Sequence, residues 1–292
     1  MKFERIAVGL VVYLSVSLHA KAEVGNIIEG AQQFIYKETA QAKLVLNAFF
    51  PSVAEHNTKR KSPAVVFFFG GGWKGGDPNQ FASHCRYLAS RGMVAMSADY
   101  RVKSRQQTTP FECVKDGKSA VRWIRSKAEE LGIDPDRIAA GGGSAGGHVA
   151  AATGTIKGMN EEGENLLISS RPNAMILFNP VYDNGPEGYG YNRVQKRWRE
   201  ISPMHNIRKG IPPTIVFLGS EDNLIPESTA EKFKRRMEKV GSLSKLYIYK
   251  GQTHGFFNYG KEGNFYEKTI LEVDKFLISL GWLEGEPSMR IP

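Results

Sequence analysis

The sequence predicts an α/β fold with a mostly parallel central sheet and helices on both faces of that sheet. Three observations lead to this fold. Short, fully apolar runs alternate with longer segments of helical character, as happens when buried parallel strands are connected by helices. The glycine-rich turn Gly142-Gly143-Ser144-Ala145-Gly146 directly follows one apolar run. Titratable polar residues follow two later apolar runs, and the carboxyl ends of the strands in such a sheet meet along one edge.

The expected strands are short apolar runs, and the expected helices lie between them. The segment 110–131 begins at Pro110, carries apolar residues at helical spacing and is ended by Gly132. Gly92 ends the segment 81–91 in the same way. The expected strands are 44–46, 64–69, 93–98, 138–141, 174–178, 214–218 and 246–249, and the expected helices are 81–91, 110–131, from 145 onward, 228–240 and 265–280.

Residues 1–22 are expected to form a signal peptide. Lys2 and Arg5 are basic, residues 6–18 are an apolar run too short to span a bilayer, and Ala20-Lys21-Ala22 supplies the small residues that precede cleavage. An uncleaved anchor is the alternative. The remainder, residues 23–292, is expected to form a single domain in the periplasm or outside the cell, without stable membrane insertion after cleavage.

The charge of the chain is basic but dispersed. Lysine and arginine number 39 against 30 aspartates and glutamates, for a net charge of +9. Because the excess is spread along the chain and no segment resembles a nucleic-acid module, we expect a solvated surface and no nucleic-acid partner.

Two cysteines, Cys85 and Cys113, are present in a chain that we expect to be exported. An oxidising compartment favours a disulfide between them. Two unpaired buried thiols are the alternative.

The turn around Ser144 has the G-x-S-x-G form of a nucleophile elbow. In that device a strand ends, the chain turns sharply and a helix begins, so that the serine hydroxyl stands clear of the sheet. Gly142 and Gly146 leave room for the helix to cross close to the strand. Because the motif also arises by chance, a glycine-rich helix start that packs or binds an anion is the alternative.

His254 is the best candidate for the base that activates Ser144, since a serine hydroxyl is a weak nucleophile until a base removes its proton. It follows the expected strand 246–249 late in the chain, as the order Ser, Asp, His requires. The other histidines are less suitable: His19 lies in the signal peptide, His56 in a polar stretch, His84 inside a helix, His148 one turn after the serine, and His205 is a candidate pocket residue.

The acid that orients the histidine should lie between Ser144 and His254 in the chain. Asp222 follows the expected strand 214–218 and is preferred. Asp183, which also follows a strand, and the neighbouring Glu221 are the alternatives.

Backbone N–H groups are expected to stabilise the oxyanion of the reaction. One should belong to Ala145, directly after the serine, and the other to the glycine loop Phe69-Gly70-Gly71-Gly72-Trp73, which follows a strand. Gly71 and Gly72 are the candidate donors, and the sequence leaves the choice between them open.

Taken together, these motifs resemble the α/β-hydrolase fold, in particular the esterases and lipases related to hormone-sensitive lipase and the bacterial carbohydrate acetyl esterases. The resemblance covers nearly all of residues 40–285, and Asp99-Tyr100-Arg101 and Gly147-His148 also carry it. It implies the catalytic set Ser144, Asp222 and His254, and no metal or organic cofactor.

This chain departs from the family in two places. Phe69 stands where the family usually has histidine before its glycines, which suggests that packing replaces a hydrogen bond there. The stretch 23–43 is too short for a helical cap, so no large cap domain is expected. The insertion 183–208, with Tyr189, Tyr191 and Trp198, is the candidate partial lid.

The sequence thus predicts an exported serine esterase that removes small acyl groups, acetyl above all, from a carbohydrate or another small-molecule or polysaccharide ester. We expect Trp73, Tyr189, His205 and Phe256 to line its pocket. A feruloyl or aryl esterase and a peptidase of the prolyl-oligopeptidase type are alternatives within the fold. A non-catalytic binding module is a further alternative, and the oligomeric state is open.

Overall fold

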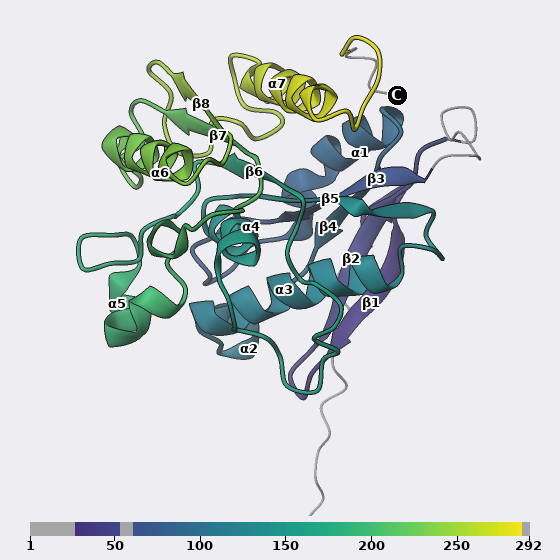
Figure 1. The fold of residues 1–292 in the computed structure, drawn as a ribbon, viewed down its shortest axis with the longest axis horizontal. Helices are drawn as coiled ribbons and strands as arrows, with labels where there is room; N and C mark the ends of the chain where they lie inside the picture. Colours follow the sequence, from purple (N-terminus) through teal and green to yellow (C-terminus); the bar gives the residue numbers. More distant parts are fainter. Residues whose placement is uncertain (1–26, 53–60, 288–292) are drawn as a thin grey trace, which may run out of the picture.

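The structure is a computed structural model that describes residues 27–52 and 61–287, so the predicted signal peptide lies outside the described residues. Its strands are β1 (Gln32–Glu38), β2 (Lys43–Phe49), β3 (Ser62–Phe68), β4 (Val94–Ala98), β5 (Ile133–Gly143), β6 (Ala174–Phe178), β7 (Thr214–Gly219) and β8 (Ser244–Tyr249). They form one sheet in the order β1-β2-β4-β3-β5-β6-β7-β8 (Figure 1). The pairs β1–β2 and β2–β4 are antiparallel and all the other pairs are parallel, which confirms the predicted sheet.

Helices cover both faces of this sheet (Figure 1). The α-helices are α1 (Ala82–Ser90), α2 (Lys103–Gln106), α3 (Pro110–Ser126), α4 (Ala145–Thr155), α5 (Tyr191–Val194), α6 (Glu227–Lys239) and α7 (Phe265–Ser279), and the 3₁₀ helices are η1 (Pro78–Phe81), η2 (Gln195–Glu200) and η3 (Pro203–Asn206). Within the described ranges, none of the helices combines the length and the apolar character needed to cross a bilayer.

Strand β3 shows how the sequence forms these layers. All seven of its residues are buried, because helices pack on both sides of the strand. Val66 and Phe68 point into one apolar core, which α3, α4 and α6 cover. Val65 and Phe67 point into the other, which α1 and α7 cover. The period of two along the strand thus divides the apolar side chains between two cores.

The two cysteines are divided between the same two cores, and the predicted disulfide is therefore wrong. Cys85 lies on α1 and Cys113 on α3, and the two side chains belong to the cores on opposite faces of the sheet. Both are buried free thiols. The thiol of Cys113 donates to Arg101 O at 3.1 Å. The alternative of two buried, unpaired thiols is therefore correct, since the sheet separates them.

Several elements differ from the prediction, among them one strand and the end of one helix. Strand β1 was not predicted, because it is an edge strand of mixed polar and apolar residues in which three of the seven positions are exposed. Helix α3 ends at Ser126, five residues before the predicted end, and the chain continues in turns to the start of β5 at Ile133.

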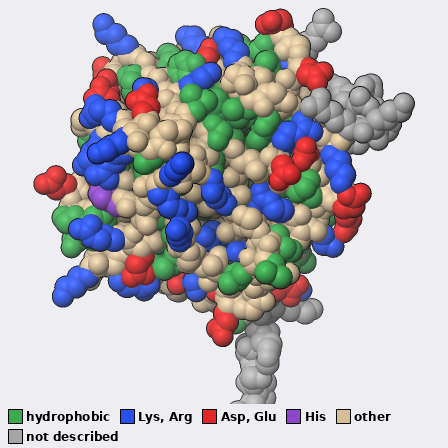
Figure 2. All heavy atoms as spheres, viewed as in Figure 1, with side chains coloured by type: hydrophobic (Ala, Val, Ile, Leu, Met, Phe, Trp, Pro, Cys, Tyr) green, Lys and Arg blue, Asp and Glu red, His purple; other side chains and the backbone are tan. Residues whose placement is uncertain are grey.

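Basic side chains are dispersed over the face drawn in Figure 2, with aspartate and glutamate side chains among them and toward the edges. Several exposed basic side chains of the chain form ion pairs with carboxylates, as in Arg197–Glu200 and Arg235–Glu231. On this face the positive excess is a solvated surface rather than a single basic patch.

The insertion 183–208, which we call the lid segment, is short and irregular. It contains α5, η2 and η3 and projects beside α2 and α3 (Figure 1). Val194 and Ile201 attach it to the body by packing against Phe111, Val114 and other apolar side chains of α3 and α4. The helices of the lid segment are only four to six residues long, so the segment is far smaller than a cap domain.

Candidate active site

Ser144 lies at the turn between β5 and α4, with its backbone in the left-handed region at φ 55° and ψ −118°. The Ser144 N–H holds this strained turn by donating to Phe178 O at 3.0 Å. A Cβ at Gly142 would lie 2.5 Å from the carbonyl of Gly146, and one at Gly146 would lie 2.0 Å from Phe68 O. Only glycine fits at these two positions, as the motif predicts.

His254 lies in the histidine loop, which we define as residues 250–264 between β8 and α7. Its Nε2 lies 2.9 Å from Ser144 Oγ, although 110 residues separate the two in the chain. Its side chain keeps 21% of its surface exposed. The ring therefore reaches both the serine and the solvent, as a proton acceptor and donor requires.

Asp222 lies on the other side of the imidazole. Its Oδ2 is 2.7 Å from His254 Nδ1, and its side chain is fully buried. Its other oxygen, Oδ1, accepts from the backbone N–H groups of Leu224 at 2.9 Å and Ile225 at 3.0 Å. The carboxylate is thus held in place and satisfied on both oxygens, which fits a group that orients a histidine.

The two alternative acids lie elsewhere. Asp183 Oδ1 accepts from the backbone N–H of Gly185 at 2.7 Å and lies 3.7 Å from His205 Nδ1. Glu221 is exposed and makes no hydrogen bond to His254 among the described residues. The structure brings Asp222, and neither alternative, to the histidine.

The glycine loop lies directly against the elbow. A Cβ at Gly70 would lie 3.2 Å from Gly143 O and 3.4 Å from Ser144 Cβ. Gly71 has φ 118°, and a Cβ there would lie 2.2 Å from Gly75 O, so the loop folds back on itself at a position that only glycine can occupy. The N–H groups of Gly71 and Gly72 find no acceptor among the described residues, whereas that of Gly70 donates to Gln80 Oε1 at 2.6 Å. Gly71 and Gly72 thus remain available as donors, together with Ala145 at the start of α4.

Phe69 supports the glycine loop by packing. Its ring stacks on Tyr100 with the ring centroids 4.2 Å apart, and the Tyr100 hydroxyl donates to Phe69 O at 2.6 Å. The guanidinium of Arg105 lies 5.9 Å from the centroid of the same ring. Aromatic contacts therefore occupy the place that the family usually gives to histidine.

A pocket of about 340 Å³ opens above Ser144, and its wall differs from the predicted one. Tyr189 lines it, as expected. Phe257 rather than Phe256 lines it, because Phe256 turns inward against Tyr249, with the ring centroids 5.1 Å apart. The other residues of the wall used below are Lys74, Gln80, Asn179, Arg193, Leu224 and Asn258.

Two further pocket predictions are wrong. Trp73 is 1% exposed and lies beneath the glycine loop, edge-on to His148, with the ring centroids 5.0 Å apart. His205 lies within the lid segment, where it bonds to Ser202 Oγ at 2.9 Å and packs on Trp198. Neither side chain is in the pocket wall, because each is used for packing.

Sequence reasoning missed the polar residues that support the site. Asn179 follows β6, its Oδ1 accepts from Gly255 N–H at 2.9 Å, and its Nδ2 lies 3.4 Å from His254 Nε2. Its position at the end of a parallel strand, like that of Asp222, was a signal that could have been used. Arg193 gave no comparable signal, because it lies in the irregular lid segment.

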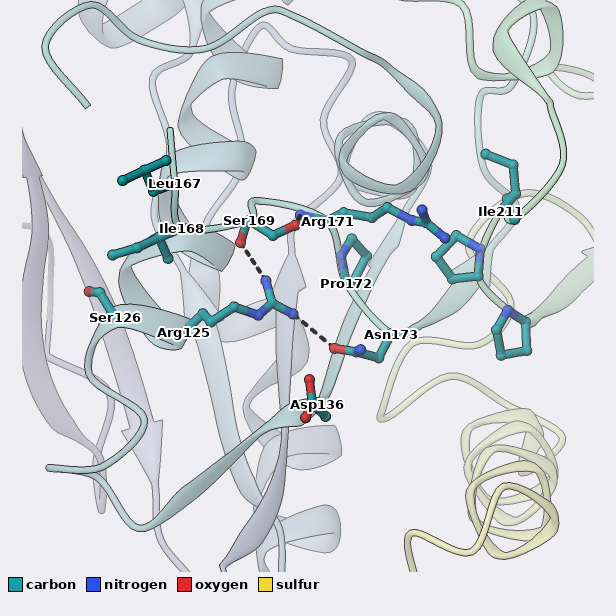
Figure 3. A pocket seen from close by; sticks show the side chains of 13 residues that line it. Arg125, Ser126, Asp136, Leu167, Ile168, Ser169, Arg171, Pro172, Asn173 and Ile211 are labelled. Atoms are coloured by element: carbon teal, nitrogen blue, oxygen red, sulfur yellow. Dashed lines mark hydrogen bonds between the residues drawn. The ribbon is translucent and has the colours of Figure 1, made fainter. Parts of the chain in front are cut away.

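A larger hollow, with a volume of about 840 Å³, lies at the end of the sheet opposite to Ser144; Figure 3 shows the side chains that line it. Arg125 crosses it and donates to Ser169 O and to Asn173 Oδ1, and Arg171 and Asp136 lie nearby. Asn173 directly precedes β6, so this hollow is at the amino ends of the strands, away from Ser144. Its described wall contains no histidine to activate a nucleophile.

In the part of the chain that the structure describes, no group of three or more His, Cys, Asp and Glu side chains is arranged to hold a metal ion.

Known proteins agree with this architecture. The BD-FAE family model matches residues 53–184, and the dienelactone hydrolase family model matches residues 187–275. Among curated proteins, a probable isoprenylcysteine alpha-carbonyl methylesterase of Arabidopsis thaliana is 29% identical over 68% of this chain and 46% of its own length. The esterase LipC of Mycobacterium tuberculosis is 28% identical over 68% of this chain and 54% of its own length. The chain spans about half the length of these curated relatives.

The similarity to a solved structure extends over more of both proteins. Esterase 2 of Thermogutta terrifontis, in a form phosphonylated by cyclosarin, is 44% identical, with a TM-score of 0.84. The alignment covers 88% of this chain and 97% of that one. Sequence identity at this level over almost the whole of a solved esterase, together with the fold described above, identifies the family. The chain belongs to the esterases of the α/β-hydrolase family.

Proposed function

We propose that this protein hydrolyses carboxylic esters, with Ser144 as nucleophile, His254 as base and Asp222 as the acid that orients the histidine. The observation that carries this proposal is the continuous line of contacts from Asp222 Oδ2 to His254 Nδ1 at 2.7 Å, and from His254 Nε2 to Ser144 Oγ at 2.9 Å. A nucleophile, a base and a group that orients the base at these distances are the arrangement that acyl transfer requires.

In the first half of the reaction, Ser144 Oγ attacks the ester carbonyl carbon while its proton passes to His254 Nε2. The carbonyl oxygen becomes an oxyanion, which the N–H groups of Ala145 and of Gly71 or Gly72 stabilise. When the tetrahedral intermediate collapses, the bond to the alcohol oxygen breaks and His254 gives its proton to the leaving alcohol. Ser144 then carries the acyl group as an ester.

In the second half, a water molecule takes the place of the alcohol. His254 removes a proton from the water as its oxygen attacks the acyl carbon, and then returns a proton to Ser144 Oγ as the carboxylic acid leaves. Asp222 accepts the hydrogen bond from His254 Nδ1–H throughout and stabilises the charged imidazolium.

We further propose that the acyl group is small and that the alcohol is a carbohydrate. The pocket has a volume of about 340 Å³, which suits a short acyl chain. Structures of the Thermogutta terrifontis esterase have been solved with propionate and with butyrate bound, and both are short acids. Lys74, Gln80 and Asn258 add hydrogen-bonding groups to the wall, as suits a hydroxylated alcohol.

A feruloyl or aryl ester is the second candidate substrate. Phe257 and Tyr189 both line the pocket and offer aromatic surface to an aromatic acyl group.

A set of esters tests the function and its finer form. Purified protein is given p-nitrophenyl esters of increasing acyl length, acetylated xylan and a feruloylated oligosaccharide, and the acids released are measured. We expect the highest kcat/KM for acetate to butyrate, acetate release from the polysaccharide, and no activity in Ser144→Ala. Preference for the feruloyl ester would favour the second candidate. Cleavage of prolyl amides but not of esters would contradict ester hydrolysis altogether.

We also propose that the protein is exported, on the basis of the sequence of residues 1–22. Amino-terminal sequencing of the protein recovered from the periplasm or the medium should begin at Glu23. Recovery only from the cytoplasm, with an uncleaved terminus, would contradict export.

A further inference from the structure

Arg193 of the lid segment reaches across the pocket wall to the glycine loop. Its Nη1 donates to Gly72 O at 2.5 Å, although 121 residues separate the two in the chain. Gly72 is one of the two candidate oxyanion donors, so the lid segment touches the part of the loop on which the proposed chemistry depends.

Two aromatic rings hold the guanidinium where it makes this bond. Its central carbon lies 5.5 Å from the ring centroid of Trp73 and 5.3 Å from that of Tyr189. Gly190, at φ 80°, brings the lid segment close to Trp73, and a Cβ at Gly190 would lie 2.7 Å from that ring. Arg193 is therefore fixed by packing from both the lid segment and the glycine loop.

The glycine loop depends on such contacts, because glycine has little conformational preference of its own. Gln80 fixes Gly70 through its N–H, and Gly71 O accepts from the N–H groups of Lys74 at 3.1 Å and Gly75 at 3.3 Å. For the Gly72 carbonyl, Arg193 is the only hydrogen-bond donor among the described residues. Without Arg193, the peptide that follows Gly72 loses the bond that sets its orientation.

We propose that Arg193 is a positioning residue, which holds Gly72 so that the glycine loop presents its N–H donors to the oxyanion. The lid segment then takes part in catalysis through the loop and does not only control access. This inference rests on the proposed ester hydrolysis and adds to it a residue that touches neither the nucleophile nor the base.

The test compares Arg193→Ala and Arg193→Lys with Arg197→Ala. Arg197 is the matched control, because it also lies in the lid segment but packs on Phe111 and pairs with Glu200, away from the pocket. For each variant we would measure kcat and KM with p-nitrophenyl acetate, and the rate of labelling by a fluorophosphonate, whose phosphonyl oxygen uses the same donors. Guanidinium chloride is then added to Arg193→Ala at millimolar concentration, with sodium chloride as the salt control.

We expect Arg193→Ala to lower kcat by about 10- to 100-fold, since loss of a whole oxyanion donor costs about 100- to 1,000-fold. KM should change little, labelling should slow in parallel, and guanidinium should restore part of both rates. Arg193→Lys should keep more activity than Arg193→Ala, and Arg197→Ala should behave like the wild type.

Either of two kinetic results for the variants would overturn the inference. If the Arg193 variants keep the wild-type kcat, or change KM alone, the lid segment affects access only. If Arg197→Ala loses as much activity, the effect comes from loss of the lid structure. Should Arg193→Ala fail to fold, the kcat of Arg193→Lys is the test: a reduced kcat supports the inference, and a wild-type kcat overturns it. A wild-type protein that neither cleaves esters nor is labelled would refute the proposed function and this inference together.

Discussion

The side-chain amide of Gln80 donates to Asn258 Oδ1 at 2.9 Å across 178 residues of sequence. Gln80 also accepts from Gly70 N–H at 2.6 Å, and Asn258 donates to Gly255 O at 2.7 Å. The pair thus joins the glycine loop to the histidine loop, directly beside Ser144. One chain of hydrogen bonds therefore fixes the position of the oxyanion donors relative to the base.

We predict that Gln80→Leu and Asn258→Leu each lower kcat by about 10-fold, the equivalent of one to two hydrogen bonds in the transition state. Because both act through the same chain of bonds, the double variant should lose far less than the product of the single losses. Steady-state kinetics on the three variants measures this coupling. Fully additive losses would show that the two loops are held independently.

Because Asp222 is assigned as the acid, we predict a large difference in kcat between variants of Asp222 and variants of Asp183. Asp222→Asn removes the charge that orients His254 and should lower kcat by about 10,000-fold. Asp183→Asn should keep nearly full activity, because Asp183 holds the turn at Gly185 in the lid segment. Kinetics of the two purified variants decides the assignment, and the opposite ranking would make Asp183 the acid.

The burial of His84 leads us to predict that the free energy of unfolding depends on pH. It is fully buried among aromatic rings, neither ring nitrogen has a hydrogen-bond partner in the described structure, and burial lowers its pKa to about 3. Below its ordinary pKa of about 6.5 the unfolded state binds a proton that the folded state does not, so the free energy of unfolding falls as the pH falls. From pH 6.5 to 4.5 this residue alone should remove about 2 kcal/mol.

Urea unfolding of the wild type and of His84→Leu at several pH values from 7 to 4.5 isolates this contribution. The variant should lose less stability over that range than the wild type, because the leucine binds no proton in either state. Parallel pH profiles would mean that His84 does not titrate on unfolding.

The separation of Cys85 and Cys113 predicts two free thiols per chain. Burial raises the pKa of both, so neither should react with an alkylating reagent in the native protein at neutral pH. In denaturant without reductant, both should react, and each should add one adduct to the intact mass. Finding no reactive thiol under those conditions would indicate a disulfide.

Much of this architecture was predictable because parallel strands bring their carboxyl ends to one edge of the sheet. Ser144, Asp222 and His254 each follow a strand, and this common position identifies them from sequence without any knowledge of distances. The elbow was also predictable, because Gly142 and Gly146 occupy positions where a Cβ would meet backbone atoms.

Other features depend on packing that no local pattern encodes. Phe256 and Phe257 are adjacent and alike in sequence, yet only Phe257 faces the pocket. Trp73 was expected in the pocket, but its ring turns under the glycine loop and packs against His148. The contact between Arg193 and Gly72 joins an irregular segment to a distant loop, and it becomes visible only in three dimensions.

The central claim is that Ser144 is the nucleophile and that the folded site activates it. Its most direct test is the intact mass of the native protein after treatment with a fluorophosphonate, followed by peptide mapping. We predict one adduct per chain on Ser144, none on Ser144→Ala, none on the denatured protein, and strongly slowed labelling of His254→Ala. An adduct on another residue, or labelling of Ser144 at the same rate in His254→Ala, would contradict the account.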